Sequence, residues 1–135
     1  MKKLLAMFAA IALSGMSFSA SAGDFGDLRT KLSTARETLI TMMLHKEQRG
    51  PEQQKLVKDS ADAVSAQLAR MKAPAGKEAQ FKELVETWKA FKETREKELV
   101  PAIIKGNEDE AKKIAGGVQK ERITKCQSLT SELDN

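Results

Sequence analysis

The strongest constraint on the fold is a pair of apolar stripes on either side of a sharp turn. Both stripes repeat every three or four residues, which places each of them on one face of a helix. The first contains Phe81, Leu84, Trp88, Phe91, Arg95 and Leu99, and the second contains Ala111, Ala115, Val118, Arg122, Cys126, Leu129 and Leu133. Gly106 and Asn107 lie between them. Because a short turn makes consecutive helices antiparallel neighbours, the sequence predicts a helical hairpin.

A second hairpin is predicted before the first. The spacing predicts a helix over residues 24–48, ended by Gly50, and another from Pro51 to about Met71. The first of these helices carries Phe25, Leu28, Leu32, Ala35, Leu39 and Met42, and the second carries Leu56, Val57, Ser60, Ala61, Val64, Leu68 and Met71. A short linker over residues 72–76 follows. The predicted fold is therefore all-α, an up-down-up-down antiparallel four-helix bundle over residues 23–135.

Two interruptions are expected in the second hairpin. Pro101 should either kink the helix near Glu98 or end it, because proline lacks an N–H and its ring clashes with the preceding turn. Gly116 and Gly117 lie inside the last helix and indicate a close helix contact or a flexible point. Asn107 is a suitable N-cap for that helix. The three acidic residues after it, 108–110, are in the first turn of the helix, where the positive end of the helix dipole stabilises negative charge.

The first 22 residues are predicted to be a cleavable signal peptide. Lys2 and Lys3 precede a short apolar run over residues 4–13, and Ala20-Ser21-Ala22 has the form of a cleavage site. Cleavage after Ala22 would give a periplasmic protein with no membrane span, and the alternative is an uncleaved anchor. The full chain has 23 basic and 19 acidic residues. Without the two signal lysines the counts are 21 and 19, so a net charge near +2 does not indicate a nucleic-acid partner.

No cofactor or metal site is expected. Cys126 is the only cysteine and does not begin a C-x-x-C-H haem motif, and His45 is the only histidine. These two residues alone cannot form a zinc or copper shell. No catalytic motif occurs, so the protein is predicted not to be an enzyme. Cys126 itself is interpreted as a small buried residue on the helix stripe, the alternatives being an intermolecular disulfide or a reactive thiol.

Three residues are candidates for a ligand-binding pocket. Arg95 and Arg122 occupy stripe positions, where an unpaired charge is costly to bury. Arg122 should lie level with residues 89–91, within reach of Trp88. Arg95 could pair with Glu98 or Glu121, and Arg36 comes level with Arg122. Two interpretations stay open: the arginines extend their charged ends into solvent from a core position, or they offer fixed guanidinium groups to a small anion. Trp88 is either a core anchor or a stacking platform.

The second half of the chain resembles the four-helix-bundle sensor domain of methyl-accepting chemotaxis receptors. The residues that carry the resemblance are Trp88, Phe91, Arg95, Val100-Pro101-Ala102-Ile103, Gly106-Asn107, Glu110-Ala111, Gly117, Gln119, Arg122 and Leu129. The receptors also carry membrane helices and a cytoplasmic signalling coiled coil that do not occur in this sequence. The resemblance therefore implies a free-standing exported module that binds a ligand or a signalling partner and is often dimeric. It implies no individual ligand contact.

Two functions are weighed at this point. The first is a periplasmic sensor-like bundle that binds a small anion or a partner, with Trp88, Arg95 and Arg122 as its site. The second is a structural or chaperone-like interaction protein without a small ligand. It is suggested by the wide apolar stripe that Ile40, Met43 and Leu44 add to the first helix, which could serve a homodimer or a periplasmic partner.

Overall fold

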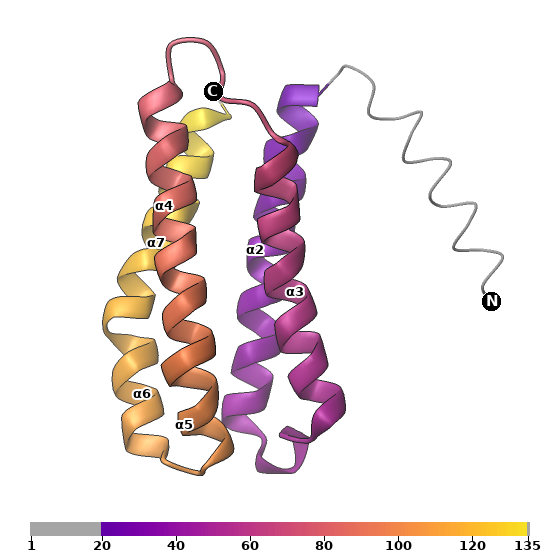
Figure 1. The fold of residues 1–135 in the computed structure, drawn as a ribbon, viewed down its shortest axis with the longest axis vertical. Coiled ribbons are helices and arrows are strands. Elements are labelled where there is room, and N and C mark those ends of the chain that lie inside the picture. Colours follow the sequence, from indigo (N-terminus) through magenta and orange to yellow (C-terminus); the bar gives the residue numbers. More distant parts are fainter. Residues whose placement is uncertain (1–19, 135) are drawn as a thin grey trace, which may run out of the picture.

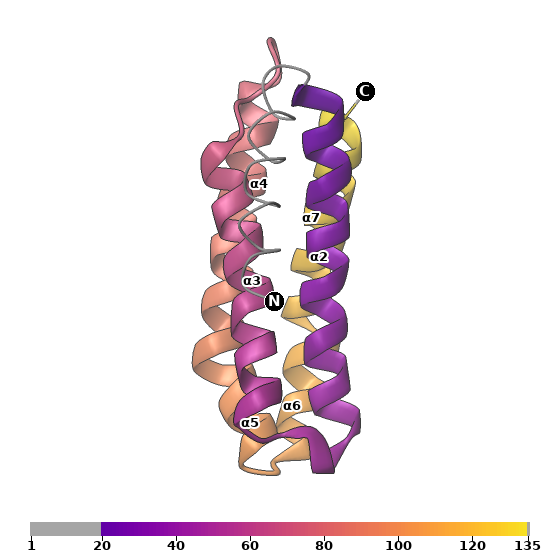
Figure 2. The same cartoon turned by 90° about the vertical axis from the view of Figure 1, so that its right-hand side faces the viewer.

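The computed structural model describes residues 20–134, which are all-helical apart from short turns. Four helical rods lie side by side (Figures 1 and 2). The first rod is α2 (Ala20–Leu44), followed by the short 3-10 turn η1 (Lys46–Gln48), and the second is α3 (Pro51–Arg70). The third is α4 (Glu78–Thr94), the π-helical turn η2 (Arg95–Leu99) and α5 (Val100–Ile104). The fourth is α6 (Glu108–Gly116) and α7 (Val118–Leu133). The predicted all-helical class is confirmed.

The rods associate as two pairs. α2 packs mainly against α3, and α4 packs mainly against α7, while α2 and α7 join the pairs. Figure 1 shows the turns at 45–50 and 105–107 at one end of the molecule, and the segment 71–77 at the other. Among residues 20–134 no helix is both long and apolar enough to span a membrane. The predicted signal peptide falls on residues 1–22, of which 1–19 lie outside the described residues.

Several helix boundaries fall at a proline or a glycine of the sequence. Pro51 is the first residue of α3. At the end of α5, Gly106 has φ +80°, and the Asn107 and Gly106 N–H groups donate to the carbonyl oxygens of Ala102 and Ile103 at 2.9 and 3.0 Å. This is the pattern of a glycine C-cap. Asn107 stands at the predicted N-cap of α6, but its side chain makes no capping hydrogen bond.

Pro101 does not end the third rod. In an α-helix the residue at position 101 would donate its N–H to Lys97, and proline has none to donate. The chain instead widens into η2, where the Val100 N–H donates to the carbonyl of Arg95, five residues back. The wider turn comes directly before Pro101 and contains Glu98. The structure therefore places the interruption close to the predicted kink, but as a π-helical turn inside a continuous rod.

Gly117 breaks the fourth rod and shifts its buried face. A Cβ atom at Gly117 would lie 2.8 Å from the carbonyl oxygen of Lys113, so only glycine fits this turn. After the break the buried stripe resumes one residue later than a continuous helix would place it. The prediction that Val118 and Arg122 lie on the buried stripe is therefore wrong, since Val118 is 42% exposed and Arg122 is half-buried. Ala115 is partly buried and packs against the core. The buried residues of this rod are Ala111, Ile114, Gln119, Ile123, Cys126, Leu129, Thr130 and Leu133.

The core divides into two clusters along the rods. The Trp88 cluster contains buried residues of α2, α3, α4 and α7, and the Leu99 cluster contains Leu39, Met42, Val57, Leu99, Ala102, Ile103, Ala111 and Ile114. All six predicted stripe residues of α2 are buried. On α3, Val57 is buried whereas Leu56 is 53% exposed, so the inclusion of Leu56 in the stripe is wrong.

Candidate functional site

Arg95 lies in the core at the first position of η2. Its side chain is fully buried. Nη1 donates to the carbonyl oxygen of Ala35 and Nη2 to that of Val57, both at 2.8 Å, so one guanidinium joins α2 to α3. The predicted ion pairs with Glu98 or Glu121 are not formed within residues 20–134. Burial lowers the pKa of Arg95 to about 10, which leaves it charged at neutral pH.

A small polar network surrounds this guanidinium. The Thr38 hydroxyl donates to the Ala35 carbonyl at 3.0 Å, and the Ser60 hydroxyl donates to the Val57 carbonyl at 3.1 Å. The two hydroxyl oxygens are 2.9 Å apart. Only Nε of Arg95 has no hydrogen-bond partner among the described residues. The Nη groups of Arg95 donate to carbonyl and hydroxyl oxygens, so Arg95 connects α2 to α3 in this structure.

Trp88 is also a core residue. It is 2% exposed, its Nε1 donates to the Ser65 hydroxyl at 3.0 Å, and its ring centroid lies 5.3 Å from that of Phe91. Cys126 belongs to the same cluster and is fully buried. Burial raises the pKa of its thiol to about 12, so little of the reactive thiolate is present at neutral pH. This is the buried, unreactive state that the sequence favours for Cys126.

Arg122 lies level with Ala90 of α4, as predicted. Its Nη1 donates to the Ala90 carbonyl at 3.2 Å, to Thr94 Oγ1 at 2.7 Å and to Gln119 Oε1 at 3.0 Å. It lines a surface hollow of mixed charge with Glu83, Glu86, Thr87, Ala90, Val118, Glu121 and Lys125. Trp88 and Arg95 do not line this hollow. The sequence predicts that Trp88, Arg95 and Arg122 form one pocket, but each of them contacts a different set of residues.

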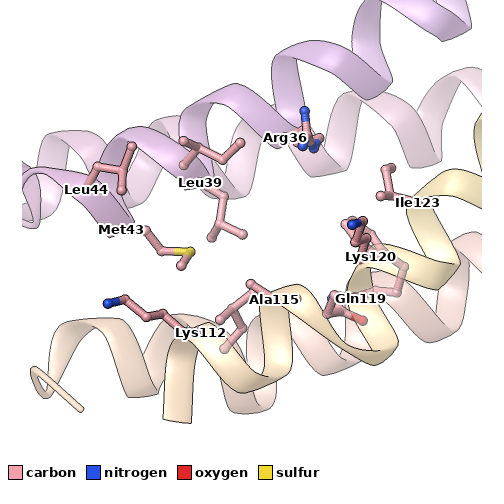
Figure 3. Close-up of a pocket in the computed structure, with 13 residues that line it drawn as sticks. Arg36, Leu39, Met43, Leu44, Lys112, Ala115, Gln119, Lys120 and Ile123 are labelled. Atoms are coloured by element: carbon pink, nitrogen blue, oxygen red, sulfur yellow. The ribbon is translucent and has the colours of Figure 1, made fainter. Parts of the chain in front are cut away.

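A more distinctive hollow lies on the opposite side of α7. It is a groove of about 430 Å³ between the C-terminal half of α2 and the rod formed by α6 and α7 (Figure 3). Its residues are Arg36, Leu39, Ile40, Met43, Leu44, Phe91, Leu99, Lys112, Ala115, Gly116, Gln119, Lys120 and Ile123. We call this the α2–α6 groove. Its volume is within the range of small-molecule sites.

The groove exists because its two walls differ in side-chain size. α2 contributes Leu39, Ile40 and Met43, whereas α6 ends in Ala115 and Gly116. Figure 3 shows Leu39 and Met43 pointing across the gap toward Ala115. α2 contacts α7 but makes little or no contact with α6. The small residues before the Gly117 break therefore leave the wide apolar stripe of α2 partly uncovered.

The charges around the groove are of one sign. Arg36, Lys112 and Lys120 line it, and no lining residue is acidic. All three are exposed, and none forms an ion pair or hydrogen bond with another residue in the part of the chain that the structure describes. An apolar hollow bordered by cations of a single sign attracts anions, because the low-dielectric wall focuses their field.

Gln119 connects the groove to the predicted arginine. It is buried in the wall of the groove, donates to the carbonyl oxygen of Phe91 at 2.9 Å and accepts from Arg122. Sequence reasoning missed the groove, although it noted the width added by Ile40, Met43 and Leu44. Lys112 and Ala115 are three residues apart within α6 and share a face without the break, whereas the place of Lys120 depends on the change of phase at Gly117.

Other site types find little support in the described residues. Within positions 20–134 no group of three or more His, Cys, Asp or Glu side chains is placed to hold a metal ion. Comparisons with protein families, with curated proteins and with solved structures find no match to this chain. The geometry of the α2–α6 groove is therefore the basis for proposing a function.

Proposed function

We propose that this protein is an exported, sensor-like ligand-binding protein that takes up a small anion in the α2–α6 groove. In this proposal the rods form an antiparallel up-down-up-down four-helix bundle, the signal peptide is cleaved after Ala22, and the protein acts in the periplasm. The observation that carries the proposal is that three cations, none of which forms an ion pair within residues 20–134, and no acidic residue line one apolar hollow. The resemblance to chemoreceptor sensor domains agrees with this function.

The proposal is one of binding rather than turnover. The groove lining contains no serine, cysteine, histidine, aspartate or glutamate. Arginine and lysine side chains are hydrogen-bond donors with no acceptor atom, which suits them to binding an anion rather than to general-base catalysis. They can form charge-assisted hydrogen bonds to a carboxylate or a similar anion. An anion in the groove would also reduce the mutual repulsion of the three cations.

A thermal-shift screen tests the proposal. Protein produced from the full-length sequence is melted with a panel of carboxylates, phosphates and their neutral analogues. A ligand at a hundredfold excess over its Kd stabilises the folded state by about 2.7 kcal/mol. The same samples give the mature N-terminus by mass spectrometry, which checks cleavage after Ala22.

Matched variants locate the site. Lys112→Gln should reduce the shift given by an anion, whereas Lys113→Gln, on the same helix but outside the groove, should not. Arg122→Gln tests the site predicted from sequence. Loss of the shift in Arg122→Gln alone would place the ligand in the hollow beside α4 and contradict the groove.

A second function is favoured by one specific observation. Among residues 23–134, three of the four exposed large apolar residues, Leu44 at 69%, Leu56 at 53% and Ile104 at 44%, lie near the end that holds the 45–50 and 105–107 turns. Such residues can form a contact with a partner protein or a second copy. Light scattering on the parent and on Leu44→Ser tests a homodimer, which should dissociate in the variant.

A further inference from the structure

We infer that the ligand of the α2–α6 groove is an amphipathic carboxylate: one anionic head attached to a flexible apolar tail. The inference rests on the proposed function and narrows its ligand class. It follows from three properties of the groove, namely its apolar walls, the position of its cations and its length.

The walls are too apolar for a small hydrophilic anion alone. Eight of the thirteen lining residues have apolar side chains. Four of these are already buried, so the apolar surface that a ligand can still cover comes from Ile40, Met43, Leu44 and Ala115. An anion such as acetate would contact the cations and leave these walls facing water. A ligand with an apolar tail covers the walls, and burial of apolar surface is the main source of favourable binding energy in such pockets.

The cations are distributed unevenly along the groove. Figure 3 shows Arg36 of α2 and Lys120 of α7 toward one end, on opposite walls, and Lys112 toward the other end near Leu44. Leu39, Met43 and Ala115 lie between the two ends. A carboxylate head placed between Arg36 and Lys120 would meet two donors. The tail would then run between Met43 and Ala115, where the alkyl stem of Lys112 can cover it.

The length of the groove sets the size of the tail. Arg36 and Leu44 are eight residues apart on α2, so the groove spans about 12 Å along the helix at 1.5 Å per residue. Its volume of about 430 Å³ also exceeds what a small anion fills. A straight-chain fatty acid of medium length matches both dimensions. Gln119 is the one uncharged polar side chain in the lining, and its amide is engaged by Phe91 and Arg122, which leaves the tail region apolar.

The test is a series of straight-chain carboxylates from acetate to dodecanoate, each used below its micelle concentration. Kd is measured by calorimetry on the protein produced from the full-length sequence. Affinity should rise about fourfold for each methylene that becomes buried. The rise should stop when the tail fills the groove. Octanol, which has the tail without the charge, should bind at least tenfold more weakly than octanoate.

Variants separate the head from the tail. Arg36→Gln and Lys120→Gln should each weaken octanoate about tenfold and leave octanol unchanged, and Lys113→Gln should match the parent for both ligands. Ala115→Leu narrows the gap opposite Met43 and should abolish the dependence on chain length. Melting temperatures of all variants without ligand confirm that they are folded.

Two results overturn the inference in different ways. If acetate or citrate binds as tightly as octanoate, and Arg36→Gln still weakens it, the tail is not recognised but the groove remains an anion site. If no carboxylate in the series responds to Arg36→Gln, Lys120→Gln or Ala115→Leu, both the amphipathic ligand and the proposed function fail.

Discussion

The two ends of this molecule are built from the same four rods but are packed differently. Around the Trp88 cluster, α2, α3, α4 and α7 are regular helices whose large apolar residues are almost completely buried. Around the Leu99 cluster, the third rod passes through a π-helical turn and the fourth is broken at Gly117. The groove lies along this second, irregular half. The comparison indicates that the regular half supplies stability, while the interruptions leave space for a ligand.

The difference can be traced to a few residues in the last two rods. Pro101 requires the wide turn that begins with Arg95, and Gly117 permits the break that ends α6 at small residues. Both features are unfavourable for a regular helix. They occur where α6 stands beside α2 without extensive contact between the two. Local departures from ideal helix geometry often coincide with functional sites.

The largest expected loss of stability is in the regular half, around the Trp88 cluster. Trp88→Ala should lower the free energy of unfolding by about 3 to 5 kcal/mol, because it leaves a large cavity between packed helices. Met43→Ala, in the wall of the groove, should cost less than about 1.5 kcal/mol, since one side of Met43 already faces open space. Urea unfolding followed by circular dichroism measures both. Equal losses would show that the groove half is packed as tightly as the Trp88 half.

Arg95 stands at the boundary between the halves, and its role is tested by two substitutions. Arg95→Ala should cost about 2 to 4 kcal/mol, as large-to-small core changes do. Arg95→Met fills most of the same volume and removes a buried cation. The carbonyl oxygens of Ala35 and Val57 lie inside α2 and α3, where each accepts the backbone N–H four residues on, so neither becomes an unpaired acceptor.

We therefore expect Arg95→Met to lie within about 1 kcal/mol of the parent, because exchanging a buried charge for an apolar residue is often neutral. Urea midpoints with unchanged slopes compare the parent and the two variants. If the methionine variant is as unstable as the alanine variant, the hydrogen bonds from the guanidinium to α2 and α3 contribute more than its volume does.

Much of the fold could be predicted because helix periodicity is a local property. The stripe of α2 and the turn at Gly106 are visible in short windows of sequence, and the structure confirms them. The turn before Pro51 is also present, but α2 ends at Leu44 rather than at residue 48, and Gly50 has φ −83°, so the expected left-handed glycine cap is not formed there. The burial of Trp88 follows from the same period. These features depend on residues three or four apart and on single turn residues, so they need no knowledge of the partner helix.

The candidate site could not be predicted in the same way. The groove depends on how α7 is rotated relative to α6. The buried stripe shifts by one residue at Gly117, where a Cβ atom would lie 2.8 Å from the Lys113 carbonyl oxygen. Arg95 stands out in the sequence as a charged residue on an apolar stripe. Its partners are the backbone carbonyls of Ala35 and Val57, and a backbone carbonyl cannot be recognised as a partner from the sequence. That Trp88, Arg95 and Arg122 bind a ligand remains a prediction. The groove variants and Arg122→Gln test whether the ligand binds in the groove or beside Arg122.

The two adjacent glycines test how the groove is made. At Gly116 a Cβ atom meets nothing within 4 Å, so Gly116→Ala should stabilise the protein by about 0.5 to 1 kcal/mol through a lower chain entropy when unfolded. At Gly117 the same atom would lie 2.8 Å from the Lys113 carbonyl, so Gly117→Ala should cost about 1 to 3 kcal/mol. The pair is matched in size and chemistry and differs only in position.

The glycine variants also connect the break to ligand binding. If Gly117 sets the separation of α6 from α2, Gly117→Ala should change the affinity for octanoate as well as the stability. Gly116 lines the groove, so Gly116→Ala adds one methyl group to its wall without altering the break, and a smaller change in Kd is expected from it. Urea unfolding and calorimetry on the two proteins give both quantities. A Gly117→Ala protein that is destabilised but binds with the parent Kd would mean that the groove is maintained by the small side chain of Ala115 and not by the break in the rod.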